Sequence, residues 1–183
     1  AGVVIGNAIE ECKILAEKLD APVCSGYQHN DSFPGSHPLA VGPLGYNGSK
    51  AAMQLISKAD VVLALGTRLN PFSTLPGYGI DYWPKNATII QVDMNPDRIG
   101  LTKKVTVGIC GDCKMVAKQI SEKLSTDAGN NGREERKNLI HKTKSAWLQT
   151  LTGLDHEEDD PGTVWNKEAR ERDKDRMSPR QAW

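Results

Sequence analysis

Several features that mark particular classes of protein are scarce or missing in this chain of 183 residues. The four cysteines are too few and too scattered to predict a disulfide framework, so reduced thiols are expected. No apolar run approaches the roughly 20 residues that span a bilayer, and no basic segment followed by a hydrophobic stretch opens the chain. These absences predict a soluble cytoplasmic protein without a membrane partner.

An excess of charge of either sign is also lacking. The 23 basic and 23 acidic residues give a formal net charge of zero, so no overall field attracts a polyanion. We therefore expect no nucleic-acid partner. A hydrophobic content of 38% suffices for one core of ordinary size, which predicts one domain with a tail.

Helical periodicity alternates with short apolar runs along the first two thirds of the chain. Asn7 to Glu10 has the form of a capping box and predicts a helix over 7–19, whereas Ser49 and Asp112 cap two later helices. Met115 is among the expected core positions of the last of these. Apolar runs predict strands at 22–25, 60–66, 88–93 and 105–110, and the run at 60–66 is expected to be buried on both faces. The fold class is therefore α/β, with a doubly wound, mainly parallel sheet and helices on both faces.

The two ends of the chain suggest a piece of a larger protein. Ala1-Gly2 stands directly before a helix, where a doubly wound fold has the glycine turn after its first strand, so we expect that first strand to be missing. Ser178-Pro179 has the form of a helix start, so a further element is expected beyond it. Before Ser178 the chain has a polar, helix-breaking segment near 125–133, followed by one more amphipathic helix and a highly charged stretch. Together these segments predict a connector.

Four motifs in order carry a family resemblance: GPLGYNG at 42–48, ADVVLALGTR at 59–68, IIQVDMNPDRIG at 89–100 and GDCK at 111–114. Together they resemble the central domain of thiamine-diphosphate-dependent enzymes of the acetolactate synthase type. The resemblance implies a Rossmann-like central domain over 1–125, a helical and charged connector over 126–176, and the start of a C-terminal diphosphate-binding domain over 177–183.

Two further stretches, 26–38 and 70–84, look like the branch of this family that acts on sulfoacetaldehyde. That resemblance implies a small-molecule substrate and an acyltransferase that converts sulfoacetaldehyde and phosphate to acetyl phosphate and sulfite, in taurine catabolism. It also implies that the N- and C-terminal domains of the same enzyme bind thiamine diphosphate and Mg²⁺, in a homo-oligomer. The present chain would then hold no catalytic or metal-binding residue and would be inactive alone. The alternatives are a central domain of an FAD-bearing acetolactate-synthase-like enzyme, and an independent nucleotide-binding module.

The resemblance also implies a set of cofactor-binding residues. In relatives that hold FAD, the ADP part contacts positions that correspond here to Gly2, Gly66, Thr67, Arg68, Asp93 and Asp112. Glycines at strand ends let backbone N–H groups approach a phosphate, and strand-end carboxylates accept hydrogen bonds from a ribose. The structural alternative is that Asp112 caps its helix, Asp93 caps a turn, and Arg68 pairs with a carboxylate.

Other polar and aromatic clusters have both a functional and a structural interpretation. His29 and Asn30, with Asp31 and His37 in the same loop, are candidates for a position near the substrate, or alternatively cap turns. Cys110 and Cys113 have redox spacing, but their position at a strand-to-helix junction favours a structural role. The aromatic cluster of Tyr78, Tyr82 and Trp83 is expected to serve packing, with pocket lining as the alternative.

Overall fold

The computed structural model describes residues 1–45 and 48–155. The chain divides into two units, Ala1–Thr143 and Lys144–Trp183. Every strand within the described ranges, and every described helix except the later part of α5, belongs to the first unit. The described part of the second unit is the later part of helix α5 (Arg133–Asp155).

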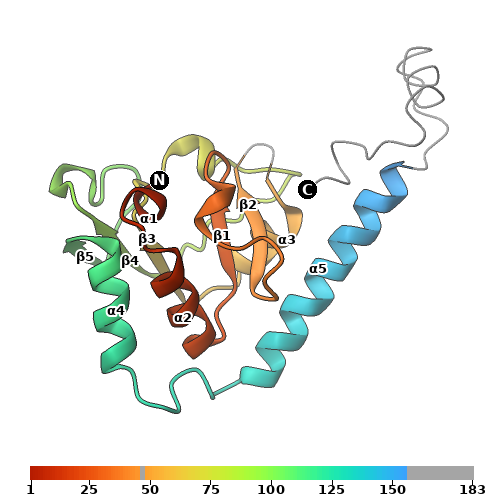
Figure 1. The fold of residues 1–183 in the computed structure, drawn as a ribbon. Helices are drawn as coiled ribbons and strands as arrows, with labels where there is room; N and C mark the ends of the chain where they lie inside the picture. Colours follow the sequence, from red (N-terminus) through yellow and green to blue (C-terminus); the bar gives the residue numbers. More distant parts are fainter. Residues whose placement is uncertain (46–47, 156–183) are drawn as a thin grey trace. The chain divides into compact units, whose positions relative to one another are not determined.

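The strands of the first unit pair in parallel and form two sheets (Figure 1). β1 (Val23–Gly26) pairs with β2 (Ala40–Leu44). A second sheet has the order β3-β4-β5, formed by Val61–Leu65, Thr88–Asp93 and Val107–Cys110. The predicted parallel α/β fold is confirmed, but the described pairings divide its sheet into two.

Strand β2 lies in a segment for which the sequence predicted no strand. Gly42 and Pro43 interrupt its apolar residues, and Gly42 adopts the left-handed backbone with φ of 92°. Both residue types normally indicate a turn, and Pro cannot donate a ladder hydrogen bond. Val41 and Leu44 nevertheless bury their side chains in the core shared with helix α3 (Lys50–Ile56), which Ser49 caps as predicted.

Three helices cover one face of the three-stranded sheet: α1 (Gly2–Ile5), α2 (Ile9–Leu19) and α4 (Cys113–Lys123). α2 and α4 lie side by side in Figure 1 and contact each other. Their buried cluster consists of Val3, Ala8, Cys12, Leu15, Val92, Cys113 and Ala117. Beside this sheet a separate cluster of Ala64, Leu69 and Ile89 is covered by side chains from loops, among them Trp83, Ala87 and Val105.

The prediction of one helix over 7–19 is wrong at its start. The chain forms α1 first, turns at Asn7 with φ of 48°, and enters α2 at Ile9 with Ala8 as its N-cap. Asn7 therefore cannot cap the helix, and Glu10 pairs instead with Lys13. Asn tolerates the left-handed backbone well, which explains why it suits this turn.

Two of the predicted core positions are also wrong. Met115 is 54% exposed, because Cys113 and Ala117, four residues apart, face the sheet from α4. Val61 is 52% exposed at the start of β3, so that strand is not buried on both faces along its whole length. Tyr82, in contrast, is buried as expected, its hydroxyl donates to the Ser73 carbonyl at 3.3 Å, and burial raises the pKa of Tyr82 to about 12.

A lysine from α2 completes the C-terminal end of α4. Lys18 Nζ donates to the carbonyls of Ser121 and Leu124 at 2.7 and 2.8 Å. The last carbonyls of a helix lack intrahelical donors, and a cation there also interacts favourably with the helix dipole. Lys18 therefore ties the two helices together at the end remote from the strand-end glycines.

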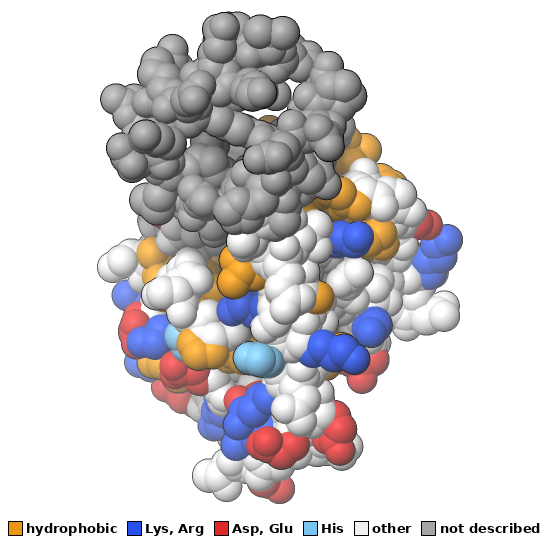
Figure 2. Space-filling model, turned by 90° about the vertical axis from the view of Figure 1, so that its right-hand side faces the viewer, with side chains coloured by type: hydrophobic (Ala, Val, Ile, Leu, Met, Phe, Trp, Pro, Cys, Tyr) orange, Lys and Arg blue, Asp and Glu red, His pale blue; other side chains and the backbone are white. Residues whose placement is uncertain are grey.

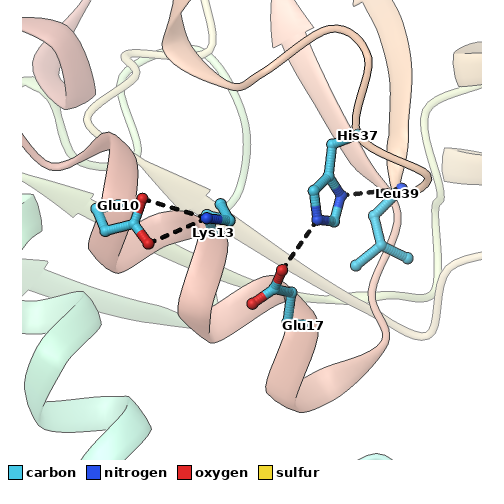
Figure 3. Close-up of polar contacts among 5 residues, drawn as sticks. All are labelled: Glu10, Lys13, Glu17, His37 and Leu39. Atoms are coloured by element: carbon cyan, nitrogen blue, oxygen red, sulfur yellow. Dashed lines mark hydrogen bonds and ion pairs between the residues drawn. The ribbon is translucent and has the colours of Figure 1, made fainter.

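We expect Lys18→Met to lower the free energy of unfolding by about 1–3 kcal/mol, because two charge-assisted hydrogen bonds are lost. Urea unfolding measures this change. The matched control is Lys13→Met on the same helix, since the ion pair that the described residues give Lys13 is with Glu10, at a partly exposed surface (Figure 3). That control should change stability by less than about 0.5 kcal/mol. Equal effects of the two substitutions would contradict the role assigned to Lys18.

The surface agrees with the balanced composition. On the face shown in Figure 2, acidic and basic side chains are interspersed. Among the described residues, no helix combines the length and the apolar character needed to cross a membrane.

Candidate site at the carboxyl ends of the strands

Gly2 and Gly66 bring two backbone segments into direct contact. The Gly2 N–H donates to the Gly66 carbonyl at 2.9 Å, which joins the start of α1 to the end of β3. A Cβ on Gly2 would lie 2.6 Å from Gly66 Cα, and a Cβ on Gly66 would lie 2.7 Å from Gly2 Cα. Gly66 also has a φ of 58°, in the left-handed region. The contact therefore requires glycine at both positions.

The loop after Gly66 is fixed by hydrogen bonds to its backbone. Gln91 Nε2 donates to the Thr67 carbonyl at 3.0 Å, and the Leu69 N–H donates to Thr67 Oγ1 at 3.2 Å. Thr102 Oγ1 donates to the carbonyls of Arg68 and Leu69 at 2.9 and 2.8 Å. Leu69 has a φ of 53°, a conformation that a non-glycine residue holds only where its surroundings enforce it.

Gln91 was missed by the sequence reasoning. Its side chain is only 1% exposed, and besides Thr67 it contacts the Arg98 carbonyl at 3.2 Å and accepts from the Gly100 N–H at 2.9 Å. The available signal was a glutamine between Ile90 and Val92 in an apolar strand. A buried amide in such a strand needs partners, and here the partners are the two loops beyond the strand ends.

Asp93 and Asp112 both hydrogen-bond to backbone near their own positions. Asp93 Oδ1 accepts from the Asn95 N–H at 2.9 Å, and Asp112 Oδ1 accepts from the Met115 N–H at 3.0 Å at the start of α4. The Gly111 N–H donates to the Asp93 carbonyl at 3.1 Å, so the two turns adjoin. The predicted capping roles are confirmed, and nucleotide binding stays a prediction.

Arg68 differs from its neighbours because its side chain is exposed. The ion pairs found within residues 1–45 and 48–155 do not include it, so the predicted pairing with a carboxylate is not found there. Its backbone is fixed through Thr102, whereas its guanidinium faces outward. Among the six residues predicted to bind a cofactor, Arg68 therefore has the exposed cationic side chain that could contact a ligand.

The loop that carries His29 and Asn30 lies next to this strand-end site. Its short helix η1 (Asn30–Ser32) contacts α1, and Asn30 Oδ1 accepts from Ser25 Oγ at 3.2 Å. His29 Nδ1 lies 3.8 Å from Asp31 Oδ1. His29 contacts Asp31 in its own loop and makes no side-chain capping bond at the start of η1, whereas Asn30 bonds to Ser25 in β1. The predicted capping of a turn is therefore not found for His29, and a position near the substrate stays a prediction for both residues.

His37, from the same loop, is held by other elements (Figure 3). Its Nδ1 accepts from the Leu39 N–H at 3.2 Å, so its Nε2 carries the hydrogen in the neutral ring. That Nε2 lies 3.1 Å from Glu17 Oε1 on α2. His37 therefore links the loop to α2, which is a structural role.

All four cysteines are free thiols, and they differ in burial. Cys113 donates through Sγ to the Gly2 carbonyl at 3.2 Å, and burial raises its pKa. Burial likewise raises the pKa of Cys12 to about 12 and that of Cys24 to about 11, whereas Cys110 is exposed. The close contact of Cys113 with Gly2 supports the structural interpretation of the Cys110–Cys113 pair.

We expect one fast-reacting thiol when the folded chain meets a thiolate-specific disulfide reagent at pH 8. Cys110 is accessible, whereas burial and a raised pKa leave almost no thiolate at Cys12 and Cys24. Cys110→Ser should remove the fast phase, and urea should expose the remaining thiols. A fast phase that survives in Cys110→Ser would contradict the described burial.

The described residues do not form a metal centre. Within the described ranges no group of three or more His, Cys, Asp or Glu side chains is arranged to hold a metal ion.

Residues 1–120 match the family model described as "Thiamine pyrophosphate enzyme, central domain". The chain is 78% identical over its full length to "Probable sulfoacetaldehyde acetyltransferase" of Rhizobium meliloti, and covers 31% of that protein. It is 72% identical over its full length to "Sulfoacetaldehyde acetyltransferase" of Roseovarius nubinhibens, and covers 30% of it. A "Probable acetolactate synthase large subunit" of Methanocaldococcus jannaschii is 38% identical over 84% of the chain, which covers 23% of that protein.

The fold also matches a solved structure. An X-ray structure of an enzyme assigned as thiamin diphosphate-dependent, from Mycobacterium smegmatis, superposes with a TM-score of 0.53 at 26% sequence identity. The match covers 68% of this chain and 24% of that one. The chain thus spans less than a third of the length of each of these four proteins.

Proposed function

Because the chain belongs to the family of thiamine pyrophosphate enzyme central domains, we propose that it is the central domain of a sulfoacetaldehyde acetyltransferase. The whole enzyme would convert sulfoacetaldehyde and phosphate to acetyl phosphate and sulfite. One observation carries this proposal: the chain is similar along its full length, at 78% and 72% identity, to proteins of that name. Thiamine diphosphate supplies the carbon–carbon and carbon–sulfur chemistry of such enzymes when it is bound, and we assign its binding, with Mg²⁺, to the N- and C-terminal domains.

The part that we assign to this chain is structural. The Gly2–Gly66 contact and the hydrogen bonds of Gln91 and Thr102 hold the carboxyl ends of β3 and β4 in one arrangement. A rigid sheet edge of this kind suits a domain that holds two neighbouring domains in a fixed position relative to each other. We propose that residues 126–176 connect it to the C-terminal domain, of which 177–183 would be the start. Residues 156–183 lie outside the described residues.

We propose that the strand-end residues stabilise turns of the fold and do not bind FAD or ADP. Asp93 and Asp112 already serve backbone N–H groups, which supports this choice. Arg68, Thr67 and the two glycines would form the site in an enzyme that binds the nucleotide. His29 and Asn30 remain our candidates for residues near the substrate, through contact with another subunit of a homo-oligomer.

An assay of the full-length enzyme with thiamine diphosphate and Mg²⁺ separates the candidate functions. We expect sulfite release from sulfoacetaldehyde in the presence of phosphate, without flavin absorbance in the purified protein. Formation of acetolactate from pyruvate would overturn the proposal in favour of an acetolactate synthase. If the enzyme catalysed neither reaction, an independent nucleotide-binding module would be the candidate function that remains.

A further inference from the structure

A groove with a volume of about 430 Å³ lies outside the strand-end site. It is lined by residues 83–87, Ile89, 102–104 and 106, and we call it the lysine groove. Its base adjoins the core cluster that contains Ile89, with Trp83 and Ala87 packed against that cluster. The groove thus combines an apolar base with a polar rim.

The rim is positively charged. Lys85, Lys103 and Lys104 line the groove, and no acidic residue does. Lys85 pairs with Asp81 at 3.1 Å, whereas the ion pairs among the described residues include neither Lys103 nor Lys104. Since the chain as a whole has no net charge, this concentration of cations is a local departure from its surface.

Contacts fix the position of one cation, Lys103, and of the base of the groove. Lys103 Nζ lies 5.0 Å from the centroid of the Trp83 ring, a favourable cation–π arrangement. Thr102 is held by its bonds to the loop at Arg68 and Leu69, and Thr106 Oγ1 accepts from the Ile89 N–H at 3.2 Å. The groove is therefore formed before any ligand arrives, which lowers the cost of binding.

We propose that the lysine groove binds a small phosphorylated ligand with a planar ring, of the class of the nucleoside monophosphates. Ammonium groups form strong charge-assisted hydrogen bonds to phosphate oxygens, and the partly exposed Trp83 ring offers a flat apolar surface to a planar group. A volume of about 430 Å³ lies in the range of small-molecule sites. The site is distinct from the strand-end residues and goes beyond the proposed transfer reaction.

Equilibrium dialysis of the full-length protein against labelled AMP tests the proposal. Lys103→Met should raise the dissociation constant about tenfold or more, because a charge-assisted hydrogen bond is lost. Lys103→Arg should retain binding, since the cation is kept. Lys58→Met, at an exposed lysine beyond α3, is the control and should leave binding unchanged, whereas Arg68→Met tests the strand-end site as the alternative place of binding.

Several outcomes would overturn the proposal. Absence of AMP binding to the unmodified protein is one, and loss of binding in Arg68→Met but not in Lys103→Met is another. Ribose 5-phosphate and adenosine serve as probes that each lack one half of the ligand chemistry, the base and the phosphate. Ribose 5-phosphate that binds as tightly as AMP would refute the role of Trp83, and adenosine that binds as tightly would refute the role of the lysines.

Discussion

Gly66→Ala is expected to prevent folding or to lower the free energy of unfolding by more than about 4 kcal/mol. The new methyl group would lie 2.7 Å from Gly2 Cα and 2.9 Å from the Gly2 carbonyl carbon. These are backbone atoms, so no side-chain rotation relieves the overlap. Alanine at a φ of 58° adds backbone strain. Soluble yield and urea unfolding measure the effect.

Gly35→Ala is the matched control for this substitution. A Cβ on Gly35 would meet no atom within 4 Å, and its φ lies outside the left-handed region. That variant should change stability by less than about 1 kcal/mol. If Gly66→Ala were tolerated as well as Gly35→Ala, the described contact between α1 and the end of β3 would be wrong.

Gln91→Met should lower the free energy of unfolding by about 3 kcal/mol or more, with little change in side-chain volume. Three backbone groups lose their partner: the carbonyls of Thr67 and Arg98 and the N–H of Gly100. Each buried polar group left without a partner costs about 1–3 kcal/mol. Urea unfolding measures the loss, and hydrogen exchange at residues 67–70 and 98–101 should increase.

The control for Gln91→Met is Gln119→Met, at an exposed position of α4. We expect that change to lie within about 0.5 kcal/mol of the unmodified chain. A small effect at both positions would mean that the strand-end loops hold their conformation without Gln91.

The sequence predicts strands best where apolar residues are continuous. The run at 88–93 became β4 with the same bounds, because its side chains meet helices on one face and loops beside the other. β2 could not be predicted, since Gly42 and Pro43 indicate a turn locally and only the pairing with β1 makes this segment a strand. Tertiary packing overrode local propensity there.

The candidate site likewise contains contacts that local sequence patterns predict and contacts that only the fold creates. The caps at Asp93 and Asp112 follow from local patterns and are confirmed. The contact of Gly2 with Gly66 was not predicted, because 64 positions of sequence separate two glycines that the fold brings together. The family resemblance named both glycines only as positions of a nucleotide site. The hydrogen bonds from Gln91 and Thr102 to the loop at 67–69 join residues far apart in the sequence. Their sequence signal is limited to one glutamine in an apolar strand.

We propose that this chain supports the active site of an enzyme whose chemistry resides in its other domains. Sulfite release from sulfoacetaldehyde, measured with phosphate, thiamine diphosphate and Mg²⁺, tests it when the full-length protein and the chain of residues 1–183 are assayed side by side. We predict turnover by the full-length protein and none by the chain alone. Turnover by the chain alone, or none by the full-length protein, would contradict the account.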